Sequence, residues 1–199
     1  MVYRNFLAGL AVGAIVTWVF SQWPLAAADK MLDVPKCIPA ATVADYLHSV
    51  IQADRTFYTT EIVERMQMRG IVVASENWRE MGKLPLPAQF LMEAGRVISQ
   101  EGSGLRIRLI SNWAINKANR PTSEFEQKGL TEILVNPDSP YTATLTRDGT
   151  TTVFQAIYAD KAVSQSCVGC HNAHPDSPRR DFKLRDVIGG LVLTLPLQR

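Results

Sequence analysis

The sequence predicts an α+β domain whose sheet is at least partly antiparallel. Three observations lead to this prediction: a long helical pattern that begins near Ala40, a hairpin pattern around Gly149, and an apolar run close to the C-terminus. Of the 199 residues, 46% are hydrophobic and 20% are charged, which is typical of a folded globular domain. The formal net charge is only +2, so we expect no nucleic-acid partner.

Residues 1–28 have the pattern of a secretory signal peptide. Arg4 is followed by an uncharged run, Phe6–Phe20, and then by three alanines that end at Ala28. This is the order of a basic region, an apolar core and a cleavage site. An uncleaved membrane anchor is the alternative, although the run is somewhat short for a span. We therefore expect an exported protein in which residues 29–39 form an extended arm, with membrane contact only if the segment stays uncleaved.

Two helices are predicted in the first half of the domain. Residues 40–68 contain no Gly or Pro, and their apolar side chains recur mostly three or four positions apart, which predicts an amphipathic helix. Gly70 is placed to end it. A second helical stretch covers residues 88–100. The first helix is long for a globular core, so we expect it to form a long packing surface, and a homodimer remains open as one use of that surface.

The middle of the chain predicts a strand and a third helix. Residues 105–113 alternate between apolar and polar positions, as a half-buried strand does. After a polar loop, Ser123 and Glu126 have the spacing of a capping box, which predicts a helix that runs to about Leu134.

A hairpin and a final strand complete the predicted sheet. Residues 141–160 contain two β-rich runs joined by Asp148-Gly149, a pair typical of hairpin turns. Residues 186–197 predict a largely buried strand in which Gly189-Gly190 permits a bulge or a close approach of another backbone. The resulting order of elements differs from the all-helical layout of small c-type cytochromes.

The stretch "SQSCVGCHNAHP" carries the clearest chemical signal. Cys167, Cys170 and His171 match the CXXCH pattern of covalent haem attachment. Two thiols at this spacing can each add to one vinyl group of a porphyrin, and the adjacent histidine then becomes an axial ligand of the iron. We expect Gly169 to keep a short loop between the thiols free of crowding. The sequence thus predicts one haem c per chain.

Three other uses of the cluster are weaker. A thioredoxin-like redox pair normally follows a strand in a βαβ unit, which the pattern lacks. A zinc site would take His174 as its fourth ligand beside Cys167, Cys170 and His171, but eight residues are few for a tetrahedral site. A disulfide between the two cysteines would close a very small ring and stabilise the fold little.

The second axial position has several candidates. Cys37 ranks first, because an unpaired thiol in an oxidising compartment is prone to form cross-links, and ligation of the iron as a thiolate would prevent this. His48 ranks second, although a helix histidine is more often structural. A methionine ranks third, from Met66, Met68, Met81 and Met92. A thiolate ligand would favour ferric iron and lower the reduction potential.

The chain also resembles a known family, through the stretches "LPLPAQFLMEA", "RLISNWAINKANRPTSEFEQKGL", "CVGCH" and "RDVIGG". It resembles cyanobacterial c-type haem proteins with a PAS-like fold, related to a ligand-sensing domain on the exported side of some sensor kinases. The resemblance implies a PAS-like antiparallel sheet with long N-terminal helices over residues 40–199, and a periplasmic or thylakoid-lumen location. It also implies haem linked through Cys167 and Cys170, with His171 and a cysteine, here Cys37, as axial ligands.

Two functions follow as expectations. The first is a redox or small-molecule sensor, in which reduction or a ligand releases the second axial residue. The second is an electron-transfer cytochrome. We do not expect an enzyme, because no acid-base residue for a peroxidase-like site is identifiable. The sequence contains no kinase or output domain, so we expect signals or electrons to pass through a redox or signalling protein partner.

Overall fold

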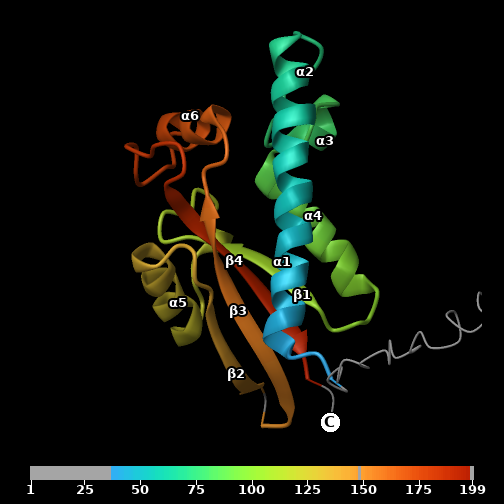
Figure 1. Ribbon diagram of the computed structural model, residues 1–199. Helices are drawn as coiled ribbons and strands as arrows, with labels where there is room; N and C mark the ends of the chain where they lie inside the picture. The colour runs from blue at the N-terminus through green and yellow to red at the C-terminus, as the bar shows by residue number, and fades with distance from the viewer. Residues whose placement is uncertain (1–36, 148, 198–199) are drawn as a thin grey trace, which may run out of the picture. The chain divides into compact units, whose positions relative to one another are not determined.

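The structure, a computed structural model, describes residues 37–147 and 149–197 (Figure 1). The chain divides into two compact units, Met1–Cys37 and Ile38–Arg199, and the second contains the fold. The predicted signal peptide, most of the predicted arm and Asp148 of the predicted turn lie outside the described residues. Within the described part, no helix is both long and apolar enough to span a membrane.

The fold is built on a four-stranded antiparallel sheet with the order β1-β4-β3-β2. The strands are β1 (Arg106–Ile110), β2 (Tyr141–Arg147), β3 (Thr151–Lys161) and β4 (Val187–Pro196). Every neighbouring pair runs antiparallel. The predictions of an α+β class and of an antiparallel sheet are therefore confirmed.

The long predicted helix is present but is not uniform. It consists of α1 (Ala40–Phe57), η2 (Tyr58–Glu64) and α2 (Arg65–Met68), and η2 is a π-helix. The chain leaves the helix at Gly70, whose φ of +67° is the left-handed conformation that glycine tolerates. A π-helix inside an α-helix is rare and often marks a functional site.

One face of the sheet is covered by α1 and by α4 (Pro87–Gln100), which confirms the helix predicted over residues 88–100 (Figure 1). Helix α4 has Leu86 as its N-cap and Pro87 as its first residue. Proline is well tolerated at this position, because the N–H that it lacks would have no partner within the helix. The short helix α3 (Trp78–Met81) precedes it. The buried side chains shared by these helices and the sheet are Ala44, Leu91, Ile107, Leu109, Phe154, Ala156, Tyr158, Leu191, Leu193 and Leu195.

The opposite face is covered by α5 (Glu124–Val135), close to its predicted limits. Ser123 caps it, since its Oγ accepts a hydrogen bond from the backbone N–H of Glu126 at 3.2 Å. The capping box is only half formed, because the Glu126 carboxylate accepts from the backbone N–H of Thr122 and from Arg108 instead. The core on this face contains Ile110, Phe125, Leu130, Ile133, Ile157 and Val192.

The final strand is buried from Ile188 to Leu195, and its glycines allow close packing. A Cβ on Gly189 would lie 2.5 Å from the backbone oxygen of Ile110, so only glycine fits there. The pairing of β3 with β4 also shifts register between Asp160 and Lys161. Both expectations for the glycine pair, a close approach and an irregular register, are confirmed.

The cysteine cluster corrects one local prediction. It does not form a loop: it lies on α6 (Gln165–Ala173), a helix inserted between β3 and β4. Ser164 caps this helix, with its Oγ accepting from the backbone N–H of Cys167 at 3.3 Å. Gly169 is therefore a helical residue, and open space surrounds the position of its missing side chain. A helix of nine residues that begins soon after a strand and ends just before Pro175 is difficult to distinguish from a loop by periodicity.

Candidate functional site

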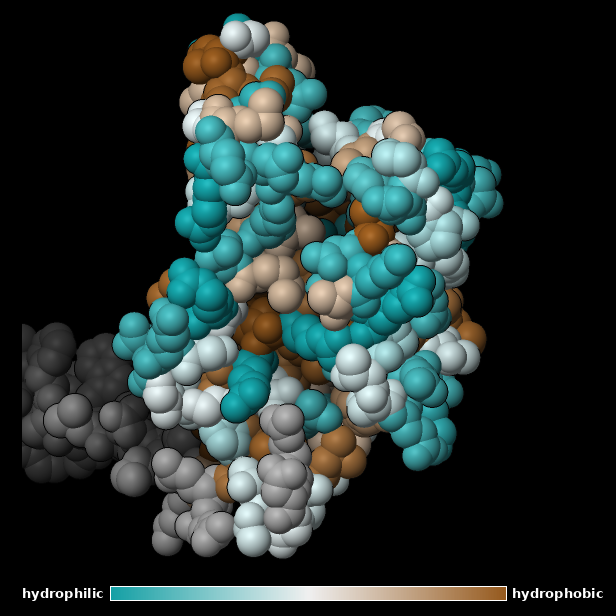
Figure 2. All heavy atoms as spheres, turned by 180° about the vertical axis from the view of Figure 1, so that it is seen from behind, coloured by the Kyte–Doolittle hydropathy of each residue, from teal (hydrophilic) through white to brown (hydrophobic). Residues whose placement is uncertain are grey.

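A cavity of about 740 Å³ lies between α6 and the C-terminal half of the long helix, which lines it from Arg55 to Gln67. Its other walls come from the start of α4, the ends of β1 and β3, and the loop after β1, which includes η3 (Lys117–Asn119). Figure 2 shows the recess from behind, with hydrophobic side chains in its depth and hydrophilic ones around it. The apolar lining includes Val63, Trp78, Met92, Leu109, Trp113, Ala114, Ile115 and Ile188.

The three motif residues converge on this cavity. Cys167, Cys170 and His171 all line it, and the two cysteines are three positions apart on α6, which places them on the same side of the helix. Both thiols are free. The His171 ring packs edge-on against Phe182, with centroids 5.7 Å apart.

Burial sets the charge of the motif. It lowers the pKa of His171, which the nearby charge of Asp160 partly offsets and those of Arg55 and His174 reinforce. Burial is also the main reason that the pKa of the Cys170 thiol is raised, with smaller contributions from Glu76 and Cys167. The site therefore contains a neutral imidazole and a protonated thiol. The Nδ1 atom of His171 is enclosed without a partner among the described residues, so Nε2 is the more accessible nitrogen.

These features weigh against the three alternatives. A thioredoxin-like pair normally lies in a βαβ unit with parallel strands, whereas α6 connects β3 to its antiparallel neighbour β4. His174 ends α6, with its Nε2 3.2 Å from Glu76 and its Nδ1 accepting from the N–H of Asp176, so it is engaged elsewhere. Among the described residues, no group of three or more His, Cys, Asp or Glu is arranged to hold a metal ion, and no disulfide joins Cys167 to Cys170.

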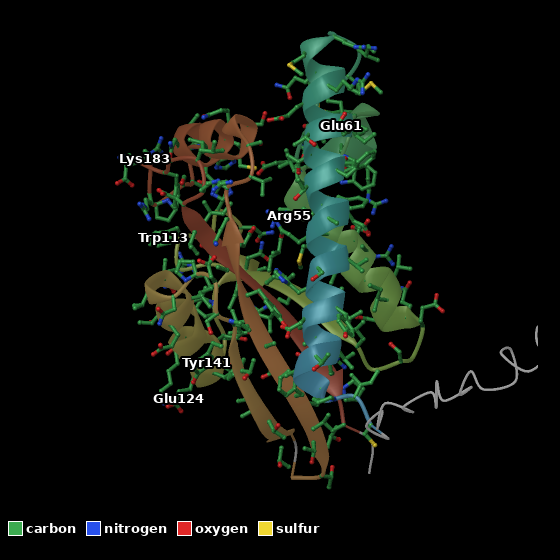
Figure 3. All side chains as sticks on the ribbon, viewed as in Figure 1. Arg55, Glu61, Trp113, Glu124, Tyr141 and Lys183 are labelled. Carbon is green, nitrogen blue, oxygen red and sulfur yellow. The ribbon has the colours of Figure 1, made fainter. Side chains whose placement is uncertain are left out.

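Sequence reasoning missed an ion pair in the cavity wall. Arg55, the last buried residue of α1, donates from Nη1 to Oδ1 of Asp160, where β3 changes register. Figure 3 shows Arg55 on the side of α1 that faces the sheet. The burial of Arg55 could have been expected from its position in the helix. It follows the half-buried Leu47 and Ile51 at intervals of four, which places it on the same face. Its partner is 105 residues away and had no such signal.

The candidates for the second axial position are dispersed. Cys37 is exposed and is the last residue of the N-terminal unit. The His48 ring does not line the cavity but stacks on Tyr158, with centroids 4.0 Å apart. Burial lowers the pKa of His48, and the charges of Asp45 and Asp160 oppose that shift. Of the four methionines considered, only Met92 lines the cavity.

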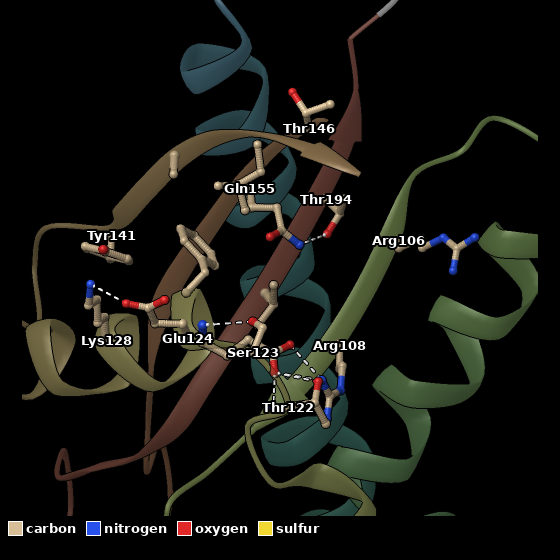
Figure 4. A pocket seen from close by; sticks show the side chains of 15 residues that line it. Arg106, Arg108, Thr122, Ser123, Glu124, Lys128, Tyr141, Thr146, Gln155 and Thr194 are labelled. Atoms are coloured by element: carbon tan, nitrogen blue, oxygen red, sulfur yellow. Dashed lines mark hydrogen bonds and ion pairs between the residues drawn. The ribbon is translucent and has the colours of Figure 1, made fainter. Parts of the chain in front are cut away.

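A second hollow, of about 670 Å³, lies between α5 and the sheet (Figure 4). Arg108 crosses one side of it and is fixed by Glu126, with Nη1 2.6 Å from Oε1, and by the carbonyl of Arg120. Gln155 and Thr194 are hydrogen-bonded on its floor. It contains no cysteine or histidine, so it offers no thiol or imidazole to a cofactor.

Residues 38–196 match the Tll0287-like family, described as Tll0287. The chain belongs to this family. The matched range includes the cavity and the whole CVGCH motif but begins one residue after Cys37. A solved structure that resembles this member of the Tll0287-like family is that of the cyanobacterial heme-protein Tll0287, with 14% identity and a TM-score of 0.47. That match covers 81% of this chain and 99% of the other. The comparison with curated proteins finds no match.

Proposed function

We propose that the chain is an exported c-type haem protein that acts as a redox or small-molecule sensor. The observation that carries the proposal is the convergence of Cys167, Cys170 and His171 on one largely apolar cavity of about 740 Å³. A cavity of this size is within the usual range for small-molecule and cofactor sites. Membership of the Tll0287-like family supports the choice of haem, since Tll0287 itself is described as a heme-protein.

The residues present fit a covalently attached haem. The two thiols on one side of α6 suit two thioether bonds to one macrocycle, and the accessible Nε2 of His171 suits axial ligation of the iron. The neutral imidazole is the form that binds a metal. Trp78 and Trp113 supply apolar walls that limit contact with water. When bound, haem supplies a one-electron redox centre and a position where a ligand can exchange.

The second axial ligand distinguishes two versions of the proposal. Cys37 is our first candidate, on the strength of the family resemblance, and its thiolate would give a low reduction potential. However, α1 meets the cavity only from Arg55 onward, about 22 Å along the helix axis from Ala40. Met92 is the alternative that the cavity supports, and a thioether ligand would raise the potential.

The sensing role rests on the location of the cavity between separate elements. A ligand that changes the contacts of α6 with the long helix would change the surface offered to a redox or signalling protein. A PAS-like ancestry of the sheet and a periplasmic or thylakoid-lumen location belong to the same proposal. The alternative function is an electron-transfer cytochrome, which needs no ligand-driven change.

Ligand binding to the reduced protein tests this choice. We expect the ferrous protein to bind carbon monoxide or nitric oxide and to change its hydrodynamic radius or its proteolysis pattern on binding. Fast electron self-exchange with no binding of either gas would instead support the electron carrier. Turnover of peroxide well above that of free haem would contradict the expectation of a non-enzyme.

A further inference from the structure

The ring of Phe182 packs against His171 but does not itself line the cavity. The two ring centroids are 5.7 Å apart, and the ring planes meet at 89°. His171 lines the cavity, whereas Phe182 is only 2% exposed and belongs to a small core with Ala162 and Ile188. The imidazole is therefore in contact with the cavity and with a buried aromatic ring at the same time.

The backbone of Phe182 is held by Asn172, the residue that follows His171 in the chain. The Asn172 side chain donates from Nδ2 to the carbonyl of Phe182 and accepts at Oδ1 from the N–H of Phe182, both at 2.9 Å. These two bonds fold the loop after α6 back beside that helix (Figure 1). An amide that uses its donor and its acceptor on one residue fixes direction as well as distance. The location of Phe182 relative to α6 is therefore set.

The ring of Phe182 is fixed by two further side chains. The guanidinium of Arg179 lies 4.4 Å from the centroid of Phe182 and 4.8 Å from that of Trp113. Trp113 and Phe182 also meet edge-on, with centroids 5.6 Å apart. Arg179 is held in turn by Asp181, with Nε 2.6 Å from Oδ1. A ring with this many fixed neighbours is a rigid support for the imidazole that it contacts.

His171 lacks the hydrogen bond that usually orients a ligating histidine. Such a histidine almost always donates its second ring N–H to a carboxylate, a backbone carbonyl or water. The Nδ1 atom of His171 is enclosed by protein atoms and has no hydrogen-bond partner among the described residues. With Nε2 directed at the iron, the orientation of the ring then depends on packing, and Phe182 is an aromatic ring that packs against it.

We propose that Phe182, held by Asn172 and Arg179, is a positioning residue that fixes the imidazole plane of His171 in place of the usual hydrogen bond. The inference rests on the proposed haem function and adds how the axial ligand of that site is oriented. A fixed plane gives the ligand one orientation relative to the porphyrin. The ferric protein should therefore show a single low-spin signal in electron paramagnetic resonance.

The g-values of that signal test the proposal, because they depend on how the plane of an axial imidazole is turned relative to haem. Phe182→Leu removes the flat ring but keeps an apolar side chain, so the imidazole should turn and the g-values should shift or split into two sets. Asn172→Ala removes both bonds to the backbone of Phe182 while both rings remain, and it should also shift them. Thioether bonds retain haem even in a less stable variant, so each signal comes from loaded protein.

Phe125→Leu is the matched control. Phe125 is also buried, at 8% exposed, but it packs against Tyr141 in the core under α5 and does not line the cavity with the motif. Loss of its ring should lower the free energy of unfolding in urea, as loss of the Phe182 ring should, and leave the g-values of the wild type. The comparison separates a change in the ligand plane from a general loss of stability.

The outcomes distinguish this role from the proposed function. A wild-type protein that acquires no haem would refute the proposed function, and the role of Phe182 with it. Haem-loaded variants of Phe182 and Asn172 with the g-values of the wild type would refute the positioning role alone, as would an equal shift in Phe125→Leu. A shift in Phe182→Leu but not in Asn172→Ala would refute the part assigned to Asn172. If Phe182→Leu yields no folded protein, Asn172→Ala decides the question.

Discussion

Two glycine substitutions close to the site should have opposite effects on stability. In Gly189→Ala the new Cβ would lie 2.5 Å from the backbone oxygen of Ile110. An ordinary carbon to oxygen contact is about 3.3 Å or longer, so β1 and β4 must separate by about 0.8 Å. Backbone cannot rotate away as a side chain can, and overpacking of this kind costs about 1–3 kcal/mol.

Gly169→Ala is the matched control within the CVGCH motif. No atom lies within 4 Å of the position that its Cβ would occupy, and the residue is inside α6. Alanine should therefore stabilise the protein by up to about 0.5–1 kcal/mol, the usual difference between alanine and glycine in a helix. It should leave haem attachment unchanged.

Urea denaturation of the two holoproteins measures both effects. We expect the free energy of unfolding of Gly169→Ala to exceed that of Gly189→Ala by about 1.5–4 kcal/mol, with equal m-values. Equal stabilities, or the reverse order, would refute the geometry described for β1, β4 and α6. Because Ile110 and Ile188 line the cavity floor, Gly189→Ala should also shift the haem absorption spectrum.

Three further predictions concern His48, Cys37 and Glu126. The pKa of His48 is lowered in the fold, so below about pH 6.5 the unfolded chain takes up a proton first and stability falls; His48→Phe should make this fall smaller, and an unchanged pH profile of unfolding would contradict the buried neutral ring. Cys37→Ala should replace the absorption spectrum of a thiolate-ligated haem with that of another low-spin haem or of a high-spin haem. An unchanged electron paramagnetic resonance signal would exclude Cys37 as a ligand. Glu126→Gln should lower the free energy of unfolding by about 1.5–3 kcal/mol, since a charged hydrogen bond to Arg108 is lost; Glu124→Gln, on an exposed pair, is its control and should change little.

Most of the fold was predictable because its elements carry local signals. The long helix over residues 40–68 and α4 follow from apolar spacing, and the hairpin from alternation and its turn pair. The strand β4 was recognisable from its largely apolar run of ten residues, a length and composition typical of a strand buried on both faces. These patterns depend on neighbours a few residues apart, which a single sequence shows directly.

The features that were missed depend on tertiary contacts or on small energy differences. The π-helix η2 differs from an α-helix by one hydrogen-bond step, and no residue type specifies it. Helix α6 is too short for its periodicity to be read, and its glycine argued for a loop. The pairing of Arg55 with Asp160 joins residues 105 positions apart, so only the folded chain reveals it.

The sequence pointed to the residues of the candidate site but not to their surroundings. The CXXCH spacing identified Cys167, Cys170 and His171, and the structure brings all three to one cavity. The walls opposite them come from α1, α4 and the loop after β1, whose approach to α6 has no signature in the sequence. For the same reason Met92 could not be separated from the other methionines until its location was known.

The central claim is that haem is covalently bound through Cys167 and Cys170 and ligated by His171. Its most direct test is the mass of the denatured chain after expression with haem-maturation machinery, compared with that of the Cys167→Ser, Cys170→Ser double variant. We expect the denatured wild type to retain the mass and the pigment of one haem, and the double variant to lose both. A wild-type chain that has the mass of the polypeptide alone, with no pigment, would contradict the claim.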